Sequence, residues 1–312
     1  FGFEGHPNNT TAEHLATLYE LGFRRLSLGI QDFDPIVQDT INRIQSVEHV
    51  ERCVEIARYL GYESINFDLI YGLPKQQLKG VVNTINEVTR LRPDRIAFYS
   101  YAHVPWIKPG QRKFTEADLP DDMEKRALYE TGREMLEEAG YMEIGMDHFA
   151  LPSDELYHAF NEKRLHRNFM GYTSCDTHLL VGLGASSISD SWFGFAQNYK
   201  KVEDYITKVN EGVLPIFRGH LLSEEDLRIR QAILDIMCRF ETNLADTDLS
   251  PEDLGDIMVR LEEMEIDGLM EFEEEGLKIT ERGKAFVRNV CMAFDLRLWR
   301  NEPKMQVFSK VI

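Results

Sequence analysis

Clustered cysteines, long apolar runs and an excess of basic residues are all missing from this chain of 312 residues. Its four cysteines stand far apart, with no CxxC or CxxxCxxC spacing, at Cys53, Cys175, Cys238 and Cys291. This spacing excludes a zinc site or an iron–sulfur cluster assembled from neighbouring residues. We therefore expect reduced, mostly buried thiols and no metal site formed by this chain.

No stretch approaches the roughly 18 uninterrupted apolar residues that a membrane span requires. The amino end also lacks the basic-then-apolar layout of a signal peptide, so we expect a cytoplasmic protein with no membrane partner. Acidic residues outnumber basic ones by 53 to 35, which gives a net charge of −18. Because this charge repels phosphate backbones and anionic lipid, we expect no nucleic-acid partner.

What the sequence does contain is a series of short apolar strands that alternate with helical stretches. The predicted strands are Phe1–Glu4, Arg25–Gln31, Ser64–Gly72, Arg95–His103 and Glu143–His148. The predicted helices between them include Ala12–Leu21, His49–Leu60 and Val81–Leu91. This alternation is typical of a parallel α/β barrel, in which the carboxyl ends of neighbouring strands converge on one mouth. We expect that mouth to be lined by Glu4, Gln31, Asp68, Ala102 and His148.

The last section of the chain has a different pattern, so we predict one domain over residues 1–219 and another over residues 220–312. Ser223 is predicted to cap a helix that runs through Phe240, with Asp226 completing a capping box. A second helix from Pro251, a hairpin over residues 268–280 and a closing helix Glu281–Trp299 suggest a helical, winged-helix-like module.

Winged-helix modules often bind DNA, but the wing of this one is acidic. Glu271 and the run from Glu273 to Glu275 stand where a phosphate-binding wing carries Lys or Arg. We therefore favour a packing or lid role for the module, with a DNA-binding regulator as the alternative.

Three positions on the predicted strands carry side chains suited to a ligand. Glu4 ends a strand before Gly5 and presents a carboxylate to a ribose or an amine, or else is a solvated loop acid. Gln31 offers an amide donor and acceptor together. Asp68 lies inside an apolar strand, where an unpaired charge costs several kcal/mol, so it requires a partner. Arg43 is a candidate partner, and an internal pair with no ligand is the alternative.

Basic residues are concentrated in a few predicted loops of this acidic chain, at Lys75, Arg112, Lys113, His166 and Arg167. Such a concentration suits a polycarboxylate substrate, although a solvated basic face explains it equally well. The glycines of the segment Gly182–Ser187 permit a close backbone approach to a ligand, but no phosphate-loop signature accompanies them.

Several of these segments together resemble the oxygen-independent coproporphyrinogen III oxidases, which are radical S-adenosylmethionine (SAM) enzymes of haem biosynthesis. The segments are Glu4–Pro7, Gly29–Phe33, Asp68–Pro74, Tyr101–His103, Gly145–Phe149 and His166–Thr173. The resemblance covers essentially the whole chain. The His166–Thr173 stretch is the discriminating one, because the related haem-chaperone branch lacks it.

The resemblance implies a partial (β/α)6 barrel that holds SAM and a [4Fe–4S] cluster, with the C-terminal domain over its mouth. It also implies oxidative decarboxylation of two propionates of coproporphyrinogen III to vinyl groups, giving protoporphyrinogen IX. In this chemistry the cluster cleaves SAM reductively and the resulting radical removes a propionate β-hydrogen. The implied partners are the tetrapyrrole substrate and an electron donor protein.

Position by position, the resemblance assigns Glu4 to the cluster-bound SAM and Ile188 to the backbone stretch near its adenine. Gln31, Arg43, Asp68 and Ala102 match positions that line the site of a second SAM. No residue is assigned a catalytic role, and Arg43 and Ile188 rest mainly on the resemblance.

The family's CxxxCxxC loop and its glycine-rich SAM-binding turn both precede the point where this chain begins. We therefore expect an amino-terminally truncated fragment whose barrel lacks its first strands, which holds no cluster and is inactive alone. The exposed edge of Phe1–Glu4 would then favour self-association. A porphyrin-binding, chaperone-type barrel without radical chemistry is the alternative function.

Overall fold

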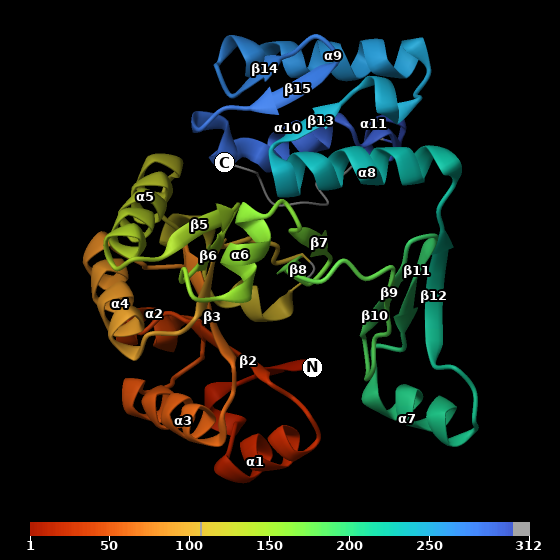
Figure 1. The fold of residues 1–312 in the computed structure, drawn as a ribbon. Helices are drawn as coiled ribbons and strands as arrows, with labels where there is room; N and C mark the ends of the chain where they lie inside the picture. Colours follow the sequence, from red (N-terminus) through yellow and green to blue (C-terminus); the bar gives the residue numbers. More distant parts are fainter. Residues whose placement is uncertain (107, 302–312) are drawn as a thin grey trace. The chain divides into compact units, whose positions relative to one another are not determined.

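The computed structural model describes residues 1–106 and 108–301 (Figure 1). The chain forms two compact units, the first over Phe1–His158 and the second beginning at Ala159. The expected boundary between residues 219 and 220 falls inside the second unit. The reason is that strand β12 (Ile216–Leu221) crosses that boundary and pairs with β11 (Gly194–Asn198). The expected C-terminal domain also includes residues 302–312, which lie outside the described residues.

The first unit is built on a six-stranded sheet with the order β1-β2-β3-β4-β6-β5. Its first four strands run parallel, as predicted: β1 (Gly2–Gly5), β2 (Arg25–Gln31), β3 (Ser64–Tyr71) and β4 (Arg95–Ser100). The crossovers contain α1 (Ala12–Glu20), α2 (Pro35–Thr40), α3 (Val47–Leu60) and α4 (Leu78–Leu91). Short 3-10 turns lie at η1 (Pro7–Asn9), η2 (Pro109–Lys113) and η3 (Glu116–Asp118).

The prediction of one parallel strand over Glu143–His148 is wrong. After α5 (Asp122–Glu138), the chain forms an antiparallel hairpin of β5 (Met142–Gly145) and β6 (His148–Ala150), and β6 also runs antiparallel to β4. Met146 reverses the chain with a left-handed backbone at φ 49°. His148 therefore begins a strand and does not end one.

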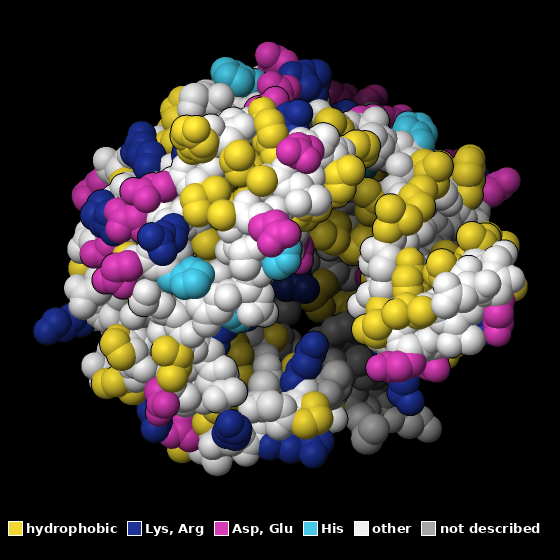
Figure 2. Space-filling view, turned by 90° about the horizontal axis from the view of Figure 1, so that it is seen from below, with side chains coloured by type: hydrophobic (Ala, Val, Ile, Leu, Met, Phe, Trp, Pro, Cys, Tyr) yellow, Lys and Arg dark blue, Asp and Glu magenta, His cyan; other side chains and the backbone are white. Residues whose placement is uncertain are grey.

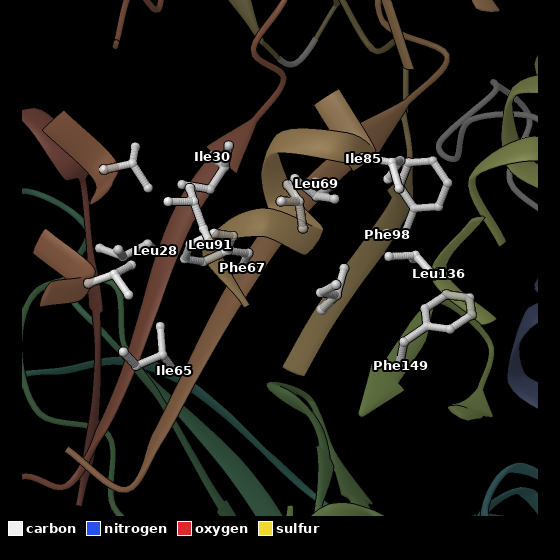
Figure 3. Close-up of a cluster of buried hydrophobic side chains, with 14 of the residues drawn as sticks. Leu28, Ile30, Ile65, Phe67, Leu69, Ile85, Leu91, Phe98, Leu136 and Phe149 are labelled. Carbon is white, nitrogen blue, oxygen red and sulfur yellow. The ribbon is translucent and has the colours of Figure 1, made fainter. Parts of the chain in front are cut away.

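One face of this sheet is apolar and is covered by helices. Alternate residues of each strand point to it, and Figure 3 shows side chains of β2, β3, β4 and β6 beside residues of α4 and α5. The buried cluster includes Leu28, Ile65, Phe67, Ile85, Phe98, Leu136 and Phe149. Because each fully buried side chain of this size contributes about 1.5–3 kcal/mol, this face holds the unit together. The opposite face is left for polar residues.

The second unit begins within α6 (Glu155–Asn161) and contains the antiparallel hairpin β7 (His166–Asn168) and β8 (Gly171–Thr173). A four-stranded sheet follows, with the order β12-β11-β10-β9. It contains β9 (Leu179–Leu180) and β10 (Ile188–Ser191), and α7 (Val202–Asn210) lies between β11 and β12 in the chain.

The last part of the second unit contains α8 (Glu224–Arg239), β13 (Glu241–Asn243), η4 (Ala245–Thr247) and α9 (Pro251–Ile266). The predicted cap of α8 is confirmed, because the amide of Asp226 donates to Ser223 Oγ and Asp226 Oδ2 accepts from the amide of Ser223. The predicted hairpin is also confirmed as β14 (Met270–Phe272) and β15 (Gly276–Ile279).

The single closing helix predicted over Glu281–Trp299 is instead broken into three pieces. These are η5 (Arg282–Phe286), α10 (Val287–Ala293) and α11 (Leu296–Arg300). Asp295 causes the second break, because its carboxylate accepts from the amide of Leu298 at 2.9 Å and so starts a new helix.

The surplus of acidic residues does not make a uniformly negative surface. On the face drawn in Figure 2, Lys and Arg side chains lie interspersed with those of Asp and Glu. Within the part of the chain that the structure describes, no helix has both the length and the apolar character needed to cross a membrane.

We predict that Gly132→Ala destabilises the first unit. A Cβ at Gly132 in α5 would lie 2.4 Å from the buried ring of Phe98, and such overpacking costs about 1–3 kcal/mol. Gly255→Ala in α9 is the matched control, because a Cβ there meets nothing within 4 Å and alanine favours the helix by about 0.5–1 kcal/mol. Urea denaturation measures both changes, and a Gly132→Ala protein as stable as the wild type would contradict the packing described.

Candidate functional site

The polar face of the six-stranded sheet begins with a row of hydrogen-bonding side chains. Glu4 on β1 pairs with Ser27 on β2, Ser27 pairs with Asn66 on β3, and Asn66 pairs with Arg95 on β4. Directly paired residues project to the same face of a sheet. Arg95 is fixed at one end of the row, since its Nε donates to the buried carboxylate of Asp154 at 2.7 Å.

A second row lies one step closer to the carboxyl ends of the parallel strands. Gly29 pairs with Asp68, Asp68 with Ala97, and Ala97 with His148. His148 thus shares a row with Asp68 although it belongs to an antiparallel strand, and its ring lies 5.7 Å from that of Tyr99. The structure therefore brings Asp68 and His148 to one face, as expected.

Asp68 is held by two neutral donors from the neighbouring row. Ser27 Oγ donates to its Oδ2 at 3.0 Å, and Asn66 Nδ2 donates to its Oδ1 at 2.9 Å. Burial raises the pKa of the Asp68 carboxyl, and the charge of Glu4 raises it further. The two donors and the Arg43 guanidinium lower the same pKa. Asp68 is thus a partly desolvated acid whose charged form depends on its neighbours.

Arg43 acts electrostatically on Asp68 and His6 and retains an unused donor. Its Nη2 donates to the carbonyl oxygen of Gly29 at 2.6 Å, while its buried Nε has no hydrogen-bond partner among the described residues. Burial lowers the pKa of Arg43 and the charge of Asp68 raises it. The pKa of His6 is lowered by burial and by Arg43. A buried donor without a partner is costly, so a ligand atom at Nε would stabilise this arrangement.

Gly29 allows Gln31 and Arg43 to meet. A Cβ on Gly29 would lie 2.9 Å from both Gln31 Nε2 and Arg43 Nη2, so the two side chains pack directly on its backbone. Gln31 reaches this position because the pairing of β2 with β3 is irregular between Gly29 and Gln31, and its own φ is 67°. Gln31 and Arg43 thus both pack on Gly29, and the charges of Glu4 and Arg43 act on Asp68, while the assignment of these residues to a ligand stays a prediction.

A buried carboxylate that the sequence analysis did not single out joins the loops after β2 and β3. Asp32 is 1% exposed and accepts from the Asp34 amide at 2.7 Å, Thr84 Oγ1 at 2.7 Å and Gln76 Nε2 at 2.5 Å. Gln76 Oε1 in turn accepts from the amides of Gly72 and Leu73. Burial raises the pKa of Asp32, and these three donors lower it. Asp32 thereby connects the two loops.

Two buried glutamines fix the segment that carries Arg43. Gln38 Nε2 donates to the carbonyl oxygens of Asp32 and Gln45, both at 2.9 Å. Gln45 Nε2 donates to the carbonyl oxygen of Ile30. The amide of Arg43 donates to the carbonyl oxygen of Gln38 at 2.8 Å, so the guanidinium projects from a rigid turn.

Ala102 and Ile188 lie in other segments of the chain, Ala102 in the first unit and Ile188 in the second. Ala102 is exposed in the loop after β4, where its carbonyl oxygen accepts from Gln111 Nε2 at 3.0 Å. Ile188 begins β10 in the second unit, and its backbone contacts Gly182, where a Cβ would lie 2.6 Å from the Ile188 oxygen. The glycine-rich segment therefore permits a close approach of the chain to itself at Ile188.

The supporting residues leave a recognisable signal in the sequence. Ser27 and Asn66 are polar residues that alternate with the apolar residues of their strands. This alternation places their side chains on the same sheet face as Asp68, opposite the face that the helices cover. Among the described residues, no three of His, Cys, Asp and Glu lie together in a way that could hold a metal ion.

Comparison with known proteins places this arrangement among radical SAM proteins. The pattern of the Radical SAM superfamily matches residues 2–88. The chain is 40% identical to an oxygen-independent coproporphyrinogen III oxidase of Helicobacter pylori over 98% of its own length and 67% of the relative. It is 42% identical to the enzyme of the same name from Pseudomonas aeruginosa, over 100% of this chain and 68% of the relative.

A solved structure gives the same result. The coproporphyrinogen III oxidase of Escherichia coli, described as a radical SAM enzyme, superimposes with a TM-score of 0.88 and 38% identity. The match covers 95% of this chain and 70% of the Escherichia coli chain. The present chain thus spans about two thirds of the length of the relatives that it matches.

We predict that Asp32→Asn destabilises the protein by about 1–3 kcal/mol. The asparagine side chain would place an N–H group against groups that themselves donate hydrogen bonds to position 32. Gln76 cannot rotate its amide to accept a hydrogen bond instead, because its oxygen already accepts from two backbone amides. Asp39→Asn, at an exposed position of α2, is the control and should change stability little. Equal urea midpoints for the two variants would count against the role assigned to Asp32.

Proposed function

Because the chain belongs to the oxygen-independent coproporphyrinogen III oxidase family of radical SAM enzymes, we propose that the polar face of its sheet is the cofactor side of the active site. The reaction of this family is the oxidative decarboxylation of a tetrapyrrole in haem biosynthesis. Two propionates of coproporphyrinogen III become vinyl groups, which gives protoporphyrinogen IX. The alternative of a porphyrin-binding chaperone gains no support, since these relatives are all named oxidases.

The observation that carries this proposal is the grouping of Glu4, Gln31, Arg43 and Asp68 around the carboxyl-terminal half of parallel strands. We assign Glu4 to the SAM that the cluster binds in this family. Gln31, Arg43, Asp68 and Ala102 are assigned to a second SAM, and Ile188 to the backbone near an adenine.

The chemistry of the grouped residues fits SAM. The ammonium and ribose hydroxyl groups of SAM can donate hydrogen bonds to the carboxylates of Glu4 and Asp68. The carboxylate of SAM can accept a hydrogen bond from the unused Nε of Arg43. When bound, SAM supplies the radical chemistry of the family. The protein side chains bind and orient it, and the partial burial of Asp68 and Arg43 strengthens their hydrogen bonds by limiting competition from water.

The C-terminal part of the second unit is proposed to have a packing or lid role as a winged-helix-like module. Its support is the sequence of α8, α9, the β14–β15 hairpin and α10. The hairpin turn carries Glu273, Glu274 and Glu275, a charge that disfavours contact with a phosphate backbone.

We predict that Asp68→Asn weakens the binding of SAM about 10- to 100-fold, because a charge-assisted hydrogen bond is lost. Isothermal titration calorimetry of this chain with SAM measures the change. Asp39→Asn makes the same chemical substitution at an exposed helix position and should leave the affinity unchanged. Unaltered binding by Asp68→Asn would remove this carboxylate from the site.

A further inference from the structure

We propose that Ser27 and Asn66 are positioning residues that hold the Asp68 carboxylate in one orientation and favour its charged form for a cationic ligand. This inference rests on the proposed function, because it concerns the same site. It adds two residues to which neither the sequence analysis nor the comparisons assign a role.

The three side chains form a closed ring of hydrogen bonds. Asn66 Nδ2 donates one hydrogen bond to Asp68 Oδ1 at 2.9 Å and a second one to Ser27 Oγ at 3.0 Å. Ser27 Oγ then donates to Asp68 Oδ2 at 3.0 Å. Each carboxylate oxygen therefore receives one neutral donor, and both amide protons of Asn66 are used. The carboxylate is held from two sides.

The sheet geometry explains why these two residues can do this. Ser27 on β2 and Asn66 on β3 are direct partners in the parallel ladder, and Asp68 stands two residues beyond Asn66 on the same face. All three donor and acceptor groups thus come from rigid strands. A site built on strands keeps its geometry better than one built on loops.

The electrostatic setting makes neutral donors useful. Glu4 on β1 places a second negative charge near Asp68, and Arg43 from the segment after α2 is the nearby cation. The strand partner of Asp68 on β4 is Ala97, which carries no charge, and Ala97 in turn pairs with His148 on β6. Burial and Glu4 both disfavour the charged form of Asp68. Ser27 and Asn66 oppose them without adding a charge that would repel a cationic ligand.

The first test is a titration of the Asp68 carboxyl group by NMR in protein labelled with ¹³C at the aspartate carboxyl carbons. The signal is assigned by its loss in Asp68→Asn. We expect Ser27→Ala to raise the pKa of Asp68 by about one unit, because a hydrogen bond to the charged form is removed. Ser27→Thr keeps the hydroxyl group and should restore the wild-type titration. Asn66→Ala should raise the pKa in the same direction.

Ser64→Ala is a matched control on the same sheet. Ser64 is buried on β3, and its hydroxyl donates to a different carboxylate, Asp154 Oδ2, at 2.9 Å. Its removal should lower stability but leave the titration of Asp68 unchanged. If Ser27→Ala behaves like Ser64→Ala, with a lower melting temperature and an unaltered Asp68 pKa, the positioning role is refuted.

The second measurement is the pH dependence of SAM affinity. The charged form of Asp68 is the binding form, so affinity falls as the pH drops through the pKa of Asp68. In Ser27→Ala this fall should occur at a pH about one unit higher. An unchanged pH profile refutes the inference. If the wild type does not bind SAM at any pH, the assigned ligand is wrong, and the NMR titration still decides whether Ser27 and Asn66 control Asp68.

Discussion

The rest of the site depends on how the partly buried charge of Asp68 is compensated. A carboxylate placed inside a strand must be compensated, and the compensation comes from Ser27, Asn66 and Arg43 together. Arg43 packs on the backbone of Gly29, where a Cβ would lie 2.9 Å from its Nη2, and its charge lowers the pKa of Asp68. The need to compensate one acid thus explains the polar residues Ser27 on β2 and Asn66 on β3, and the position of Arg43 after α2.

The six-stranded sheet keeps its apolar and polar side chains on opposite faces. One face carries the apolar residues that pack against the helices, and the other carries the polar rows. Behind the rows, Asp32 joins the loops after β2 and β3, so the positions of Gln31 and Arg43 are set by buried hydrogen bonds. This separation lets the opposite face be polar without weakening the core.

Much of this arrangement could be predicted from the sequence. The alternation of strands and helices predicted the four parallel strands, and parallel order predicted that Glu4, Gln31 and Asp68 would meet. The hairpin at Met146 was missed because one left-handed residue reverses a strand without a strong local signal. The Asp32 network was missed because its partners are far apart in the chain and meet only after folding. Arg43 was a candidate partner of Asp68 from the residues, but its assignment to a SAM site rested mainly on the resemblance.

The most direct test of the central claim is a crystal structure of this chain with SAM bound. The account predicts the ligand on the polar face of the six-stranded sheet, within hydrogen-bond distance of the Asp68 carboxylate and the Arg43 guanidinium. A ligand bound elsewhere, or Glu4 and Asp68 found on separate surfaces, would contradict it.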